Sequence, residues 1–324
     1  MTGVGEGAPG WADAGVILPW TGYIQYRDKR VLSENWDAMQ LYMQHLETTY
    51  PDHLWTNKAY GDWLAIGSHT PRTLIGTAFW AYDATLMAQM ADALGKTEDA
   101  SRYRTLFAQL RDAFNRAFVQ PDGTVGSGSQ TSYVLALHMN LLPAALQQVA
   151  TDKLVADIHA HNNHLTTGIL GTPYLLLELS RRGHSDVAYQ LLLQNTFPSW
   201  LYMVQNGATT MWERWNGNQM LGDPAMNSFN HYAYGAVGAW LYRYAAGIDE
   251  DTADPGFHHI VLHPQFSTQL GKVSANYDSP YGPISSSWTA SDGLASWTVI
   301  IPTNTTASLV FPAKAKILAG GKPI

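Results

Sequence analysis

The stretch Ala208-Thr-Thr-Met-Trp-Glu-Arg-Trp-Asn-Gly217 gives the clearest indication of the fold and chemistry of this chain. In the sequence of this stretch, Glu213 stands between two tryptophans, Trp212 and Trp215. Aromatic surroundings remove water from a carboxyl group, which can then serve as a general acid or base near neutral pH. A tryptophan face also suits the C–H face of a sugar, because it is large, flat and apolar. In the alternative interpretation, Glu213 pairs with Arg214 in a loop and both tryptophans belong to the core.

The composition restricts the classes of function. At 324 residues the chain can form two domains with a sizeable core. Charged residues make up 14% and aromatic residues 12%, which is more typical of a carbohydrate groove than of a nucleic-acid surface. The net charge of −7 and the lack of any Lys/Arg run argue against a nucleic-acid partner. The chain has no cysteine, which excludes disulfides, thiolate catalysis and Cys-ligated metals, and we predict no cofactor.

The sequence shows no targeting or membrane signal. Residues 1–10 are rich in glycine and lack the basic region followed by an apolar region that marks a signal peptide. No apolar run reaches the ~18 residues that a membrane span needs. We therefore expect a cytoplasmic protein with no membrane partner.

On both sides of the quoted stretch, apolar residues recur at the spacing of amphipathic helices. The expected helices cover residues 11–26, 31–49, 70–94, 97–118, 131–139, 143–161, 173–182, 184–195 and 228–246. Gly95 suits the end of the third helix, and residues 197–224 form a long aromatic loop. Because short turns alternate with long loops, consecutive helices pair. Stacked pairs make a toroid whose long loops gather at one mouth.

The pattern changes after Gly247. Short runs of alternating polarity follow over residues 257–311, separated by Pro, Gly, Asn and Asp. This pattern is typical of a small antiparallel β domain. We therefore predict a mainly α chain with two domains, a helical domain over residues 1–248 and an antiparallel β-sandwich over residues 249–324.

Several long loops of the helical domain combine polar and aromatic residues. They are Gly10-Trp-Ala-Asp13, Gly61-Asp-Trp63, Leu165–Gly171 and Thr209–Gly217. His231 stands at the start of the last expected helix. Asp13 and Asp62 are candidate site carboxylates, although each also has a structural interpretation, Asp13 as the N-cap of its helix and Asp62 as a buried cap.

Three histidines, His159, His161 and His164, are close enough in sequence to suggest a metal site. Two of them are two residues apart, which places them on different faces of a helix. No carboxylate of suitable spacing joins them. We therefore predict no metal site.

Motifs throughout the chain match one known family. They are Ala208–Gly217, Asn227-Ser-Phe-Asn-His-Tyr-Ala-Tyr-Gly235, Trp240-Leu-Tyr-Arg243, Pro9-Gly-Trp-Ala-Asp-Ala14 with Pro19-Trp20, Tyr60-Gly-Asp-Trp-Leu64, Thr167-Gly-Ile-Leu-Gly-Thr-Pro173, Phe257-His-His-Ile-Val-Leu-His-Pro264 and Ser279-Pro-Tyr-Gly282. In this order they resemble the bacterial α-L-rhamnosidases of glycoside hydrolase family 78. The resemblance covers nearly the whole chain. It implies a six-hairpin (α/α)6 barrel followed by a β-sandwich, and inverting hydrolysis of terminal α-L-rhamnosides.

The resemblance also implies a role for each candidate residue. Glu213 matches the family's general base, which deprotonates the water that attacks the anomeric carbon. The residues expected to bind the sugar are Trp11, Trp63, Trp212, Trp215 and His231. Asp13 and Asp62 match acidic positions at the barrel mouth, where they are candidates for a substitute acid or a sugar contact.

One family motif has no match in these 324 residues. The family's general acid lies in a motif of the form Asp-x-x-x-Arg-Asp-Glu-Arg-x-Gly-Trp-x-Gly-Asp, upstream of the first matched loop. The chain therefore resembles the C-terminal half to two-thirds of a family member, with a truncated (α/α)6 toroid over residues 1–248. Homo-oligomerisation could cover the helix faces that the missing helices leave open.

Three functions are compatible with this pattern. In the first, the chain is an active rhamnosidase in which Glu213 works with a substitute acid. In the second, it is a non-hydrolytic remnant that binds a rhamnose-containing glycoside. In the third, the truncated barrel has acquired a different activity.

Overall fold

The computed structural model describes residues 7–223, 228–311, 316–319 and 322–323. The chain divides into two compact units. The helical unit comprises the chain up to Tyr23 together with Asp28–Gly238, and the sheet unit comprises Ile24–Arg27 together with Ala239–Ile324. The sheet unit is therefore discontinuous in sequence, because a short segment near the N-terminus belongs to it.

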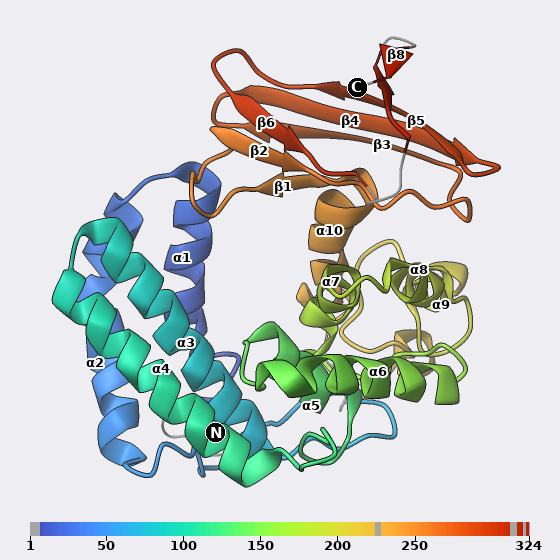
Figure 1. Cartoon of the computed structure of the whole chain (residues 1–324). Helices are drawn as coiled ribbons and strands as arrows, with labels where there is room; N and C mark the ends of the chain where they lie inside the picture. The colour runs from blue at the N-terminus through green and yellow to red at the C-terminus, as the bar shows by residue number, and fades with distance from the viewer. Residues whose placement is uncertain (1–6, 224–227, 312–315, 320–321, 324) are drawn as a thin grey trace. The chain divides into compact units, whose positions relative to one another are not determined.

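Helices that follow one another in the chain make up most of the helical unit (Figure 1). They are α1 (Ala14–Tyr26), α2 (Arg30–Thr49), α3 (Arg72–Leu94), α4 (Thr97–Phe118), α5 (Gln130–His138), α6 (Ala144–Ala160), α7 (Thr172–Arg181), α8 (Ser185–Leu193) and α9 (Trp200–Gln205). Helix α3 packs along α4, α5 along α6 and α7 along α8, so consecutive helices form hairpins. The predicted helices agree with α1 to α8 to within three residues at either end, whereas α9 lies in the stretch predicted as a loop.

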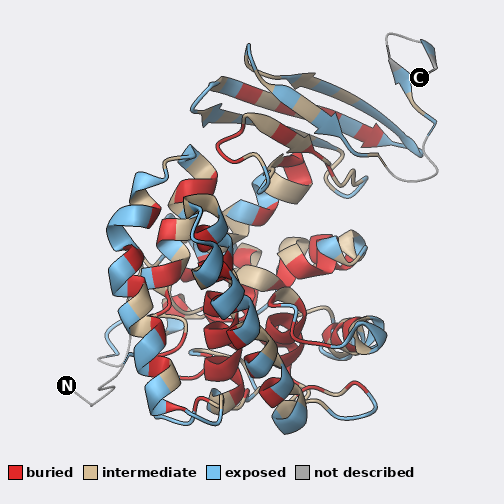
Figure 2. Ribbon diagram, turned by 60° about the vertical axis from the view of Figure 1, so that its left-hand side comes forward, coloured by how far each residue is buried: buried red, intermediate tan, exposed pale blue. Residues whose placement is uncertain are grey.

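The sequence explains which helices are amphipathic and which are enclosed. The buried stripe of α2 consists of Leu32, Trp36, Met39, Met43 and Leu46. Helix α3 is buried on most sides, because small residues stand between its large apolar ones (Figure 2). One of them is Gly76, where a Cβ would lie 2.4 Å from the ring of Trp55. Gly95, with a φ of 74°, ends α3 as predicted.

The helix predicted over residues 228–246 is wrong in its first turn and irregular thereafter. It consists of the 3-10 turn η2 (Ala233–Ala236), the helix α10 (Val237–Trp240) and the π-helical turn η3 (Leu241–Ala246). Residues 228–231 do not join it, because their backbone pairs with residues 210–213 instead. Gly247, with a φ of 76°, ends the element.

In the described part of the sheet unit, the strands form two three-stranded sheets and a short hairpin (Figure 1). The strands are β1 (Ile248–Glu250), β2 (His259–Leu262), β3 (Lys272–Ser279), β4 (Gly282–Ser291), β5 (Leu294–Ile300), β6 (Thr306–Leu309), β7 (Leu318–Ala319) and β8 (Lys322–Pro323). The pairs β3–β4, β4–β5, β1–β2 and β7–β8 are antiparallel, as predicted. The pair β2–β6 is parallel, with Ile260 opposite Ala307, because β6 is reached by a connection from the other sheet.

Alternate residues of these strands enclose a small apolar core. Its buried members are Ala246, Ile248, Phe257, Ile260, Leu262 and Ile284. The carbonyl groups at the end of η3 bind side chains of β4. Ala245 O accepts a hydrogen bond from Trp288 Nε1 (2.7 Å), and Ala246 O accepts one from Ser286 Oγ (2.6 Å). The end of the helix is therefore capped by the sheet.

The segment Ile24–Arg27 is held in the sheet unit by side-chain contacts. The hydroxyl of Tyr277 donates to Gln25 Oε1 (2.6 Å), and Arg27 Nη1 lies 2.8 Å from Asp254 Oδ1. Both partners belong to the C-terminal part of the chain. The last residues of α1 thus complete a unit whose other residues come more than two hundred positions later.

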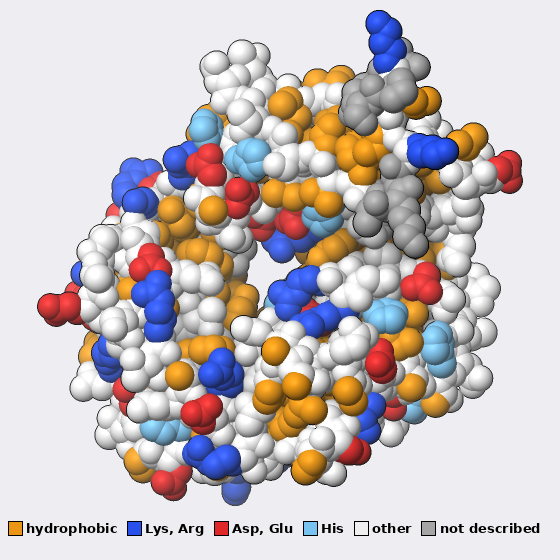
Figure 3. All heavy atoms as spheres, in the orientation of Figure 1, with side chains coloured by type: hydrophobic (Ala, Val, Ile, Leu, Met, Phe, Trp, Pro, Cys, Tyr) orange, Lys and Arg blue, Asp and Glu red, His pale blue; other side chains and the backbone are white. Residues whose placement is uncertain are grey.

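Charged side chains of both signs are interspersed on the face drawn in Figure 3. The outer helices contribute ion pairs of opposite charge, such as Arg102 with Glu47 at 2.7 Å. No helix within the described ranges is both long and apolar enough to cross a membrane.

Candidate functional site

Glu213 lies where residues 210–213 run beside residues 228–231, and two backbone hydrogen bonds join the two segments. Glu213 N–H donates to Ser228 O (2.9 Å), and His231 N–H donates to Met211 O (2.8 Å). The hydroxyl of Thr210 donates to the carbonyl of Phe229, farther along the two segments. We call these two segments the Glu213 ladder. It fixes the backbone of Glu213 although neither segment belongs to a helix.

Among the residues that the structure describes, two donors hold the side chain of Glu213, which is half-buried. Glu213 Oε1 accepts a hydrogen bond from Trp63 Nε1 (3.2 Å), and Oε2 accepts one from Ser228 N–H (3.0 Å). An ionised carboxylate can accept about four hydrogen bonds. The group is thus fixed in direction but retains capacity for a water or a ligand hydroxyl.

Asp62 is buried, and its carboxylate is saturated with donors. Its Oδ2 accepts from the Thr131 hydroxyl (2.5 Å) and from Gly168 N–H (2.7 Å). Its Oδ1 accepts from the N–H groups of Leu170 (2.9 Å) and Gly171 (3.2 Å). Burial raises the pKa of Asp62, and these hydrogen bonds oppose the shift. The sequence left open a substitute acid, a sugar contact and a buried cap at this position, and in the structure a neighbouring loop engages both oxygens.

A row of aromatic rings leads to Glu213. Trp11, which is half-buried, meets Tyr60 edge-on with ring centroids 5.3 Å apart, and Tyr60 meets Trp63 edge-on at 6.3 Å. Trp63 is 38% exposed, more than any other tryptophan predicted for the site. The guanidinium carbon of Arg214 lies 5.9 Å from the centre of the Trp63 ring, within the range of a cation–π contact. Trp63 therefore offers an accessible ring beside Glu213.

Trp212 and Trp215 lie in the interior. Trp212 is 6% exposed and meets Phe229 edge-on at 5.7 Å. Trp215 is 1% exposed, stacks on Tyr234 at 3.8 Å and meets Trp200 edge-on at 5.3 Å. A ring enclosed in this way cannot lie flat on a sugar. The structure thus places both indoles where the alternative interpretation of the sequence put them, in the core behind Glu213.

Asp13 lies in the turn that precedes α1 and is 2% exposed. Its Oδ2 accepts from Gly10 N–H (2.5 Å), and its Oδ1 accepts from the Tyr42 hydroxyl on α2 (3.0 Å). Burial and the neighbouring charge of Asp13 raise the pKa of Asp83, on α3, well above its usual range. Asp13 therefore closes its own turn and ties it to the helices behind it, rather than facing an open mouth.

His231 is part of the Glu213 ladder and is half-buried. Its Nδ1 accepts from Ala233 N–H (3.2 Å), and its ring stacks on that of Tyr232, with centroids 5.2 Å apart. These contacts fix the imidazole at the start of η2. A location on the ladder is compatible with the predicted sugar contact.

The structure therefore joins some of the predicted residues and separates others. Contacts link Trp11, Trp63, Asp62, Glu213 and His231 through Tyr60 and the Glu213 ladder. The hydrogen bonds of Asp13 lead to its own turn and to α2. Sequence reasoning missed Tyr60 and Arg214, although both stand inside quoted motifs. It also missed the donor Ser228 N–H, since a backbone group leaves no mark in a sequence.

The three histidines considered for a metal site have other partners. His159 Nδ1 lies 2.7 Å from Asn163 Oδ1, and His164 Nε2 lies 2.8 Å from Thr196 Oγ1. Within the ranges that the structure describes, no three His, Cys, Asp or Glu side chains are grouped so as to hold a metal ion.

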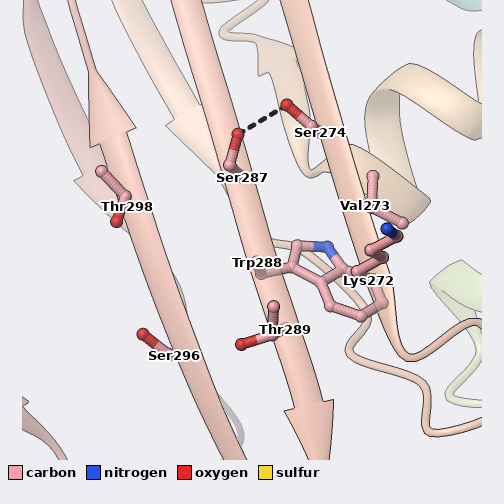
Figure 4. A pocket seen from close by; sticks show the side chains of 8 residues that line it. All are labelled: Lys272, Val273, Ser274, Ser287, Trp288, Thr289, Ser296 and Thr298. Carbon is pink, nitrogen blue, oxygen red and sulfur yellow. Dashed lines mark hydrogen bonds between the residues drawn. The ribbon is translucent and has the colours of Figure 1, made fainter.

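The sheet unit has a hollow of its own, of about 500 Å³, on one face of β3, β4 and β5 (Figure 4). Its lining residues are Lys272, Val273, Ser274, Ser287, Trp288, Thr289, Ser296 and Thr298. The hydroxyl groups of Ser274 and Ser287 hydrogen-bond to each other across the strands (2.8 Å). None of the described residues that line this hollow is a carboxylate, so they do not supply the acid–base chemistry predicted from the sequence.

Two family models match the chain. The bacterial alpha-L-rhamnosidase six-hairpin glycosidase domain matches residues 1–245, and the bacterial alpha-L-rhamnosidase C-terminal domain matches residues 247–322. Together they account for both units. The fold class predicted from the sequence, a six-hairpin glycosidase-like helical domain followed by a β domain, is confirmed.

Individual relatives agree with the family models. An alpha-L-rhamnosidase of Streptomyces avermitilis is 45% identical over 313 residues, which cover 96% of this chain and 30% of that protein. One from Formosa agariphila is 38% identical over 320 residues, covering 95% and 34%. This chain thus spans about a third of the length of the curated relatives it matches.

Solved structures show the same architecture. The crystal structure of the Streptomyces avermitilis alpha-L-rhamnosidase complexed with L-rhamnose superposes with a TM-score of 0.90 at 44% identity, covering 95% of this chain and 30% of that one. The alpha-L-rhamnosidase of Aspergillus terreus gives a TM-score of 0.86 at 31% identity, covering 97% and 37%.

Proposed function

Because this chain belongs to the bacterial α-L-rhamnosidase family, we propose that it hydrolyses terminal α-L-rhamnosides with Glu213 as the general base. One observation carries the assignment. The Glu213 carboxylate is half-buried, held by one indole N–H and one backbone N–H, and lies beside the exposed ring of Trp63. A carboxylate oriented in this way can accept a proton from a water molecule at a sugar bound against the indole.

The proposed reaction inverts the anomeric centre. In an inverting glycosidase the base activates a water on one face of the sugar, while an acid on the other face protonates the leaving oxygen. The sequence motif that carries the family's acid has no match in these 324 residues. Asp62 has both oxygens engaged, and Asp13 is enclosed, so neither is presented as a proton donor. For these 324 residues assayed on their own, we therefore expect hydrolysis to be fastest for glycosides whose leaving group needs no proton.

The test measures release of the phenol from p-nitrophenyl α-L-rhamnoside. The wild-type chain should release it, and Glu213→Gln should lower the rate by about 10²- to 10⁴-fold, the usual contribution of a general base. Glu34→Gln, a matched change at an exposed position on α2, should leave the rate unchanged. NMR of the first product formed should show the anomer opposite to that of the substrate. Equal release by wild type and Glu213→Gln would overturn the proposal.

A second function is favoured by the accessible ring of Trp63 and by the position of His231 on the Glu213 ladder. In it, the chain binds a rhamnose-containing glycoside without cleaving it, through Trp63 and His231. Calorimetry with L-rhamnose should then show binding that Trp63→Ala abolishes, in a protein that hydrolyses neither p-nitrophenyl nor 2,4-dinitrophenyl α-L-rhamnoside. Turnover of the dinitrophenyl substrate would decide for the hydrolase, because that leaving group departs without protonation.

A further inference from the structure

We infer that Asp62 is a positioning residue, which holds Trp63 in hydrogen-bond contact with Glu213 and neither donates a proton to the substrate nor touches it. The inference rests on the proposed role of Glu213 for its kinetic consequence. Its structural basis, the way in which two loops are locked together, is independent of that role.

The first step of the argument is the number of donors that Asp62 receives. Three of its hydrogen bonds come from backbone N–H groups of one loop, at Gly168, Leu170 and Gly171, and the fourth comes from the Thr131 hydroxyl. A buried carboxylate is stable only when its lone pairs are satisfied, and bonds to a charged acceptor are the stronger ones. The loop of residues 168–171 is thus wrapped around the carboxylate of Asp62.

The second step is that the backbone at Trp63 and shortly after it is tied to residues 166–169. Ile169 N–H donates to the carbonyl of Trp63 itself (2.9 Å), and Ile66 N–H donates to Thr166 O (3.0 Å). These bonds require the two loops to lie at a fixed separation. Asp62 sets that separation, because its side chain spans the gap between them.

The third step is the closeness of the two backbones. A Cβ at Gly168 would lie 2.3 Å from the carbonyl oxygen of Trp63 and 2.7 Å from that of Asp62. Only glycine allows this approach. The two backbones are therefore in direct contact, and Trp63 cannot move toward the loop of residues 168–171 while that loop stays in place.

The final step concerns the side chain of Trp63. The ring is 38% exposed, and its Nε1 reaches Glu213 Oε1 at 3.2 Å, the long end of the hydrogen-bond range. Tyr60 touches the ring only by its edge, and Arg214 lies 5.9 Å from its centre. Since the ring is 38% exposed and its hydrogen bond to Glu213 is long, a shift of its backbone would break that bond. Asp62 thereby acts on Glu213 through Trp63.

The test follows the indole N–H resonance of Trp63, assigned by its loss in Trp63→Phe. In Glu213→Ala this resonance should move to the position of an unbonded indole. Asp62→Asn keeps the shape of the side chain, but its NH2 group cannot accept the hydrogen bonds that Gly168 N–H and the Thr131 hydroxyl donate to Asp62. This variant should move the Trp63 resonance in the same direction. Amide exchange at Gly168 and Leu170 should become about tenfold faster or more, as expected when a charge-assisted bond is lost. Asp83→Asn, an equally buried change on α3, should leave both readings unchanged.

Thr131→Val covers the case in which Asp62→Asn fails to fold. It removes one donor and should give a smaller change in the same direction. A folded Asp62→Asn or Thr131→Val protein whose Trp63 resonance and loop exchange match those of wild type would overturn the inference.

A kinetic arm separates positioning from acid catalysis. If Asp62 were the acid, Asp62→Asn would slow p-nitrophenyl α-L-rhamnoside far more than the dinitrophenyl glycoside. A positioning residue should slow both by the same factor, and Asp62→Asn combined with Trp63→Phe should be no slower than Trp63→Phe alone. A wild-type chain that turns over neither substrate would reject the proposed hydrolase, while the Trp63 resonance would still decide on the role of Asp62.

Discussion

Asp62 and Glu213 are carboxylates at the two ends of one path of contacts, and the regions around them differ in the number of donors they supply. The loop of residues 168–171, together with Thr131, gives Asp62 four hydrogen bonds in a buried setting. The Glu213 ladder and Trp63 give Glu213 two hydrogen bonds in a half-exposed one. A carboxylate with its lone pairs filled serves the fold, whereas one with capacity left can accept a proton. An acidic side chain near the candidate site therefore need not take part in the reaction.

The largest expected effect is a loss of stability when the carboxylate of Asp62 is removed. Asp62→Ala leaves three buried N–H groups and one hydroxyl without their acceptor, which should cost about 3–5 kcal/mol in the free energy of unfolding. Glu213→Ala should cost under about 1 kcal/mol, because water can replace the lost acceptor at a half-exposed site. Urea denaturation of both variants measures the difference. Equal losses would mean that the two regions do not differ in the way described.

A second prediction compares two glycines. Gly168→Ala forces a methyl group against the carbonyl oxygens of Asp62 and Trp63, and overpacking of this kind costs about 1–3 kcal/mol. At Gly235, beside the other region, the nearest atom to an added Cβ is a carbon of Met211 at 3.9 Å, an ordinary contact. Gly235→Ala should therefore stay within about 0.5 kcal/mol of wild type. Thermal melting followed by circular dichroism ranks the two, and a tolerated Gly168→Ala would show that the loops can move apart.

A third prediction removes one hydroxyl from each region. Thr131→Val deletes the hydrogen bond to Asp62 in a buried setting and should cost about 1–2 kcal/mol. Thr210→Val deletes the hydroxyl that donates to Phe229 O at an exposed position, where the effect should be within about 0.5 kcal/mol. Both changes preserve the shape of the side chain. Denaturation midpoints that fall in the opposite order would contradict the comparison.

The last prediction concerns a third carboxylate, Glu250 in the sheet unit. Burial, and then the charge of Asp249, raise the pKa of Glu250 to about 7 in spite of its ion pair with Arg243. Between pH 4.5 and about 7 the folded state thus holds a proton that the unfolded state has lost, so Glu250 makes stability fall as pH rises through this window. Asp249, whose pKa the hydrogen bond from His263 and the charge of Arg243 lower, has the opposite dependence at lower pH.

The measurement is the unfolding free energy of Glu250→Gln at pH 5 and pH 7.5. Because Gln mimics the protonated form, the variant should lose less stability between these values than wild type, by about 2 kcal/mol. A parallel pH dependence in the two proteins would show that Glu250 is ionised throughout.

The sequence was sufficient for the elements whose stability is local. The stripe of Leu32, Trp36 and Met39 predicts α2, and Gly95 predicts the end of α3, because both signals lie within a few residues. The start of the last helix was mispredicted for the opposite reason. Residues 228–231 have helical neighbours, but their backbone binds residues 210–213, from which the aromatic loop separates them.

The candidate site was predictable in its motifs and not in its contacts. The Glu213 and Trp63 motifs could be identified, but their side chains meet across 150 positions. Trp215 has the same residue type as Trp63 and stands closer to Glu213 in sequence, yet it stacks on Tyr234 inside the fold. Nor could the sequence show that Asp62 takes its donors from a loop more than a hundred positions away. Tertiary packing decides which ring or carboxylate stays exposed, and the spacing of residues in the sequence does not predict it.

The discontinuity of the sheet unit limits how evolution or an engineer could move it between proteins. A gene fragment that starts at residue 247, where the second family model begins, would encode the strands without Gln25 and without the Ala245 carbonyl. Trp288 and Tyr277 would then lose acceptors that lie in the last turn of a helix and in the last turn of α1. The β domain of this chain thus cannot be exchanged on its own, since it depends on two stretches of helix that are encoded upstream of it.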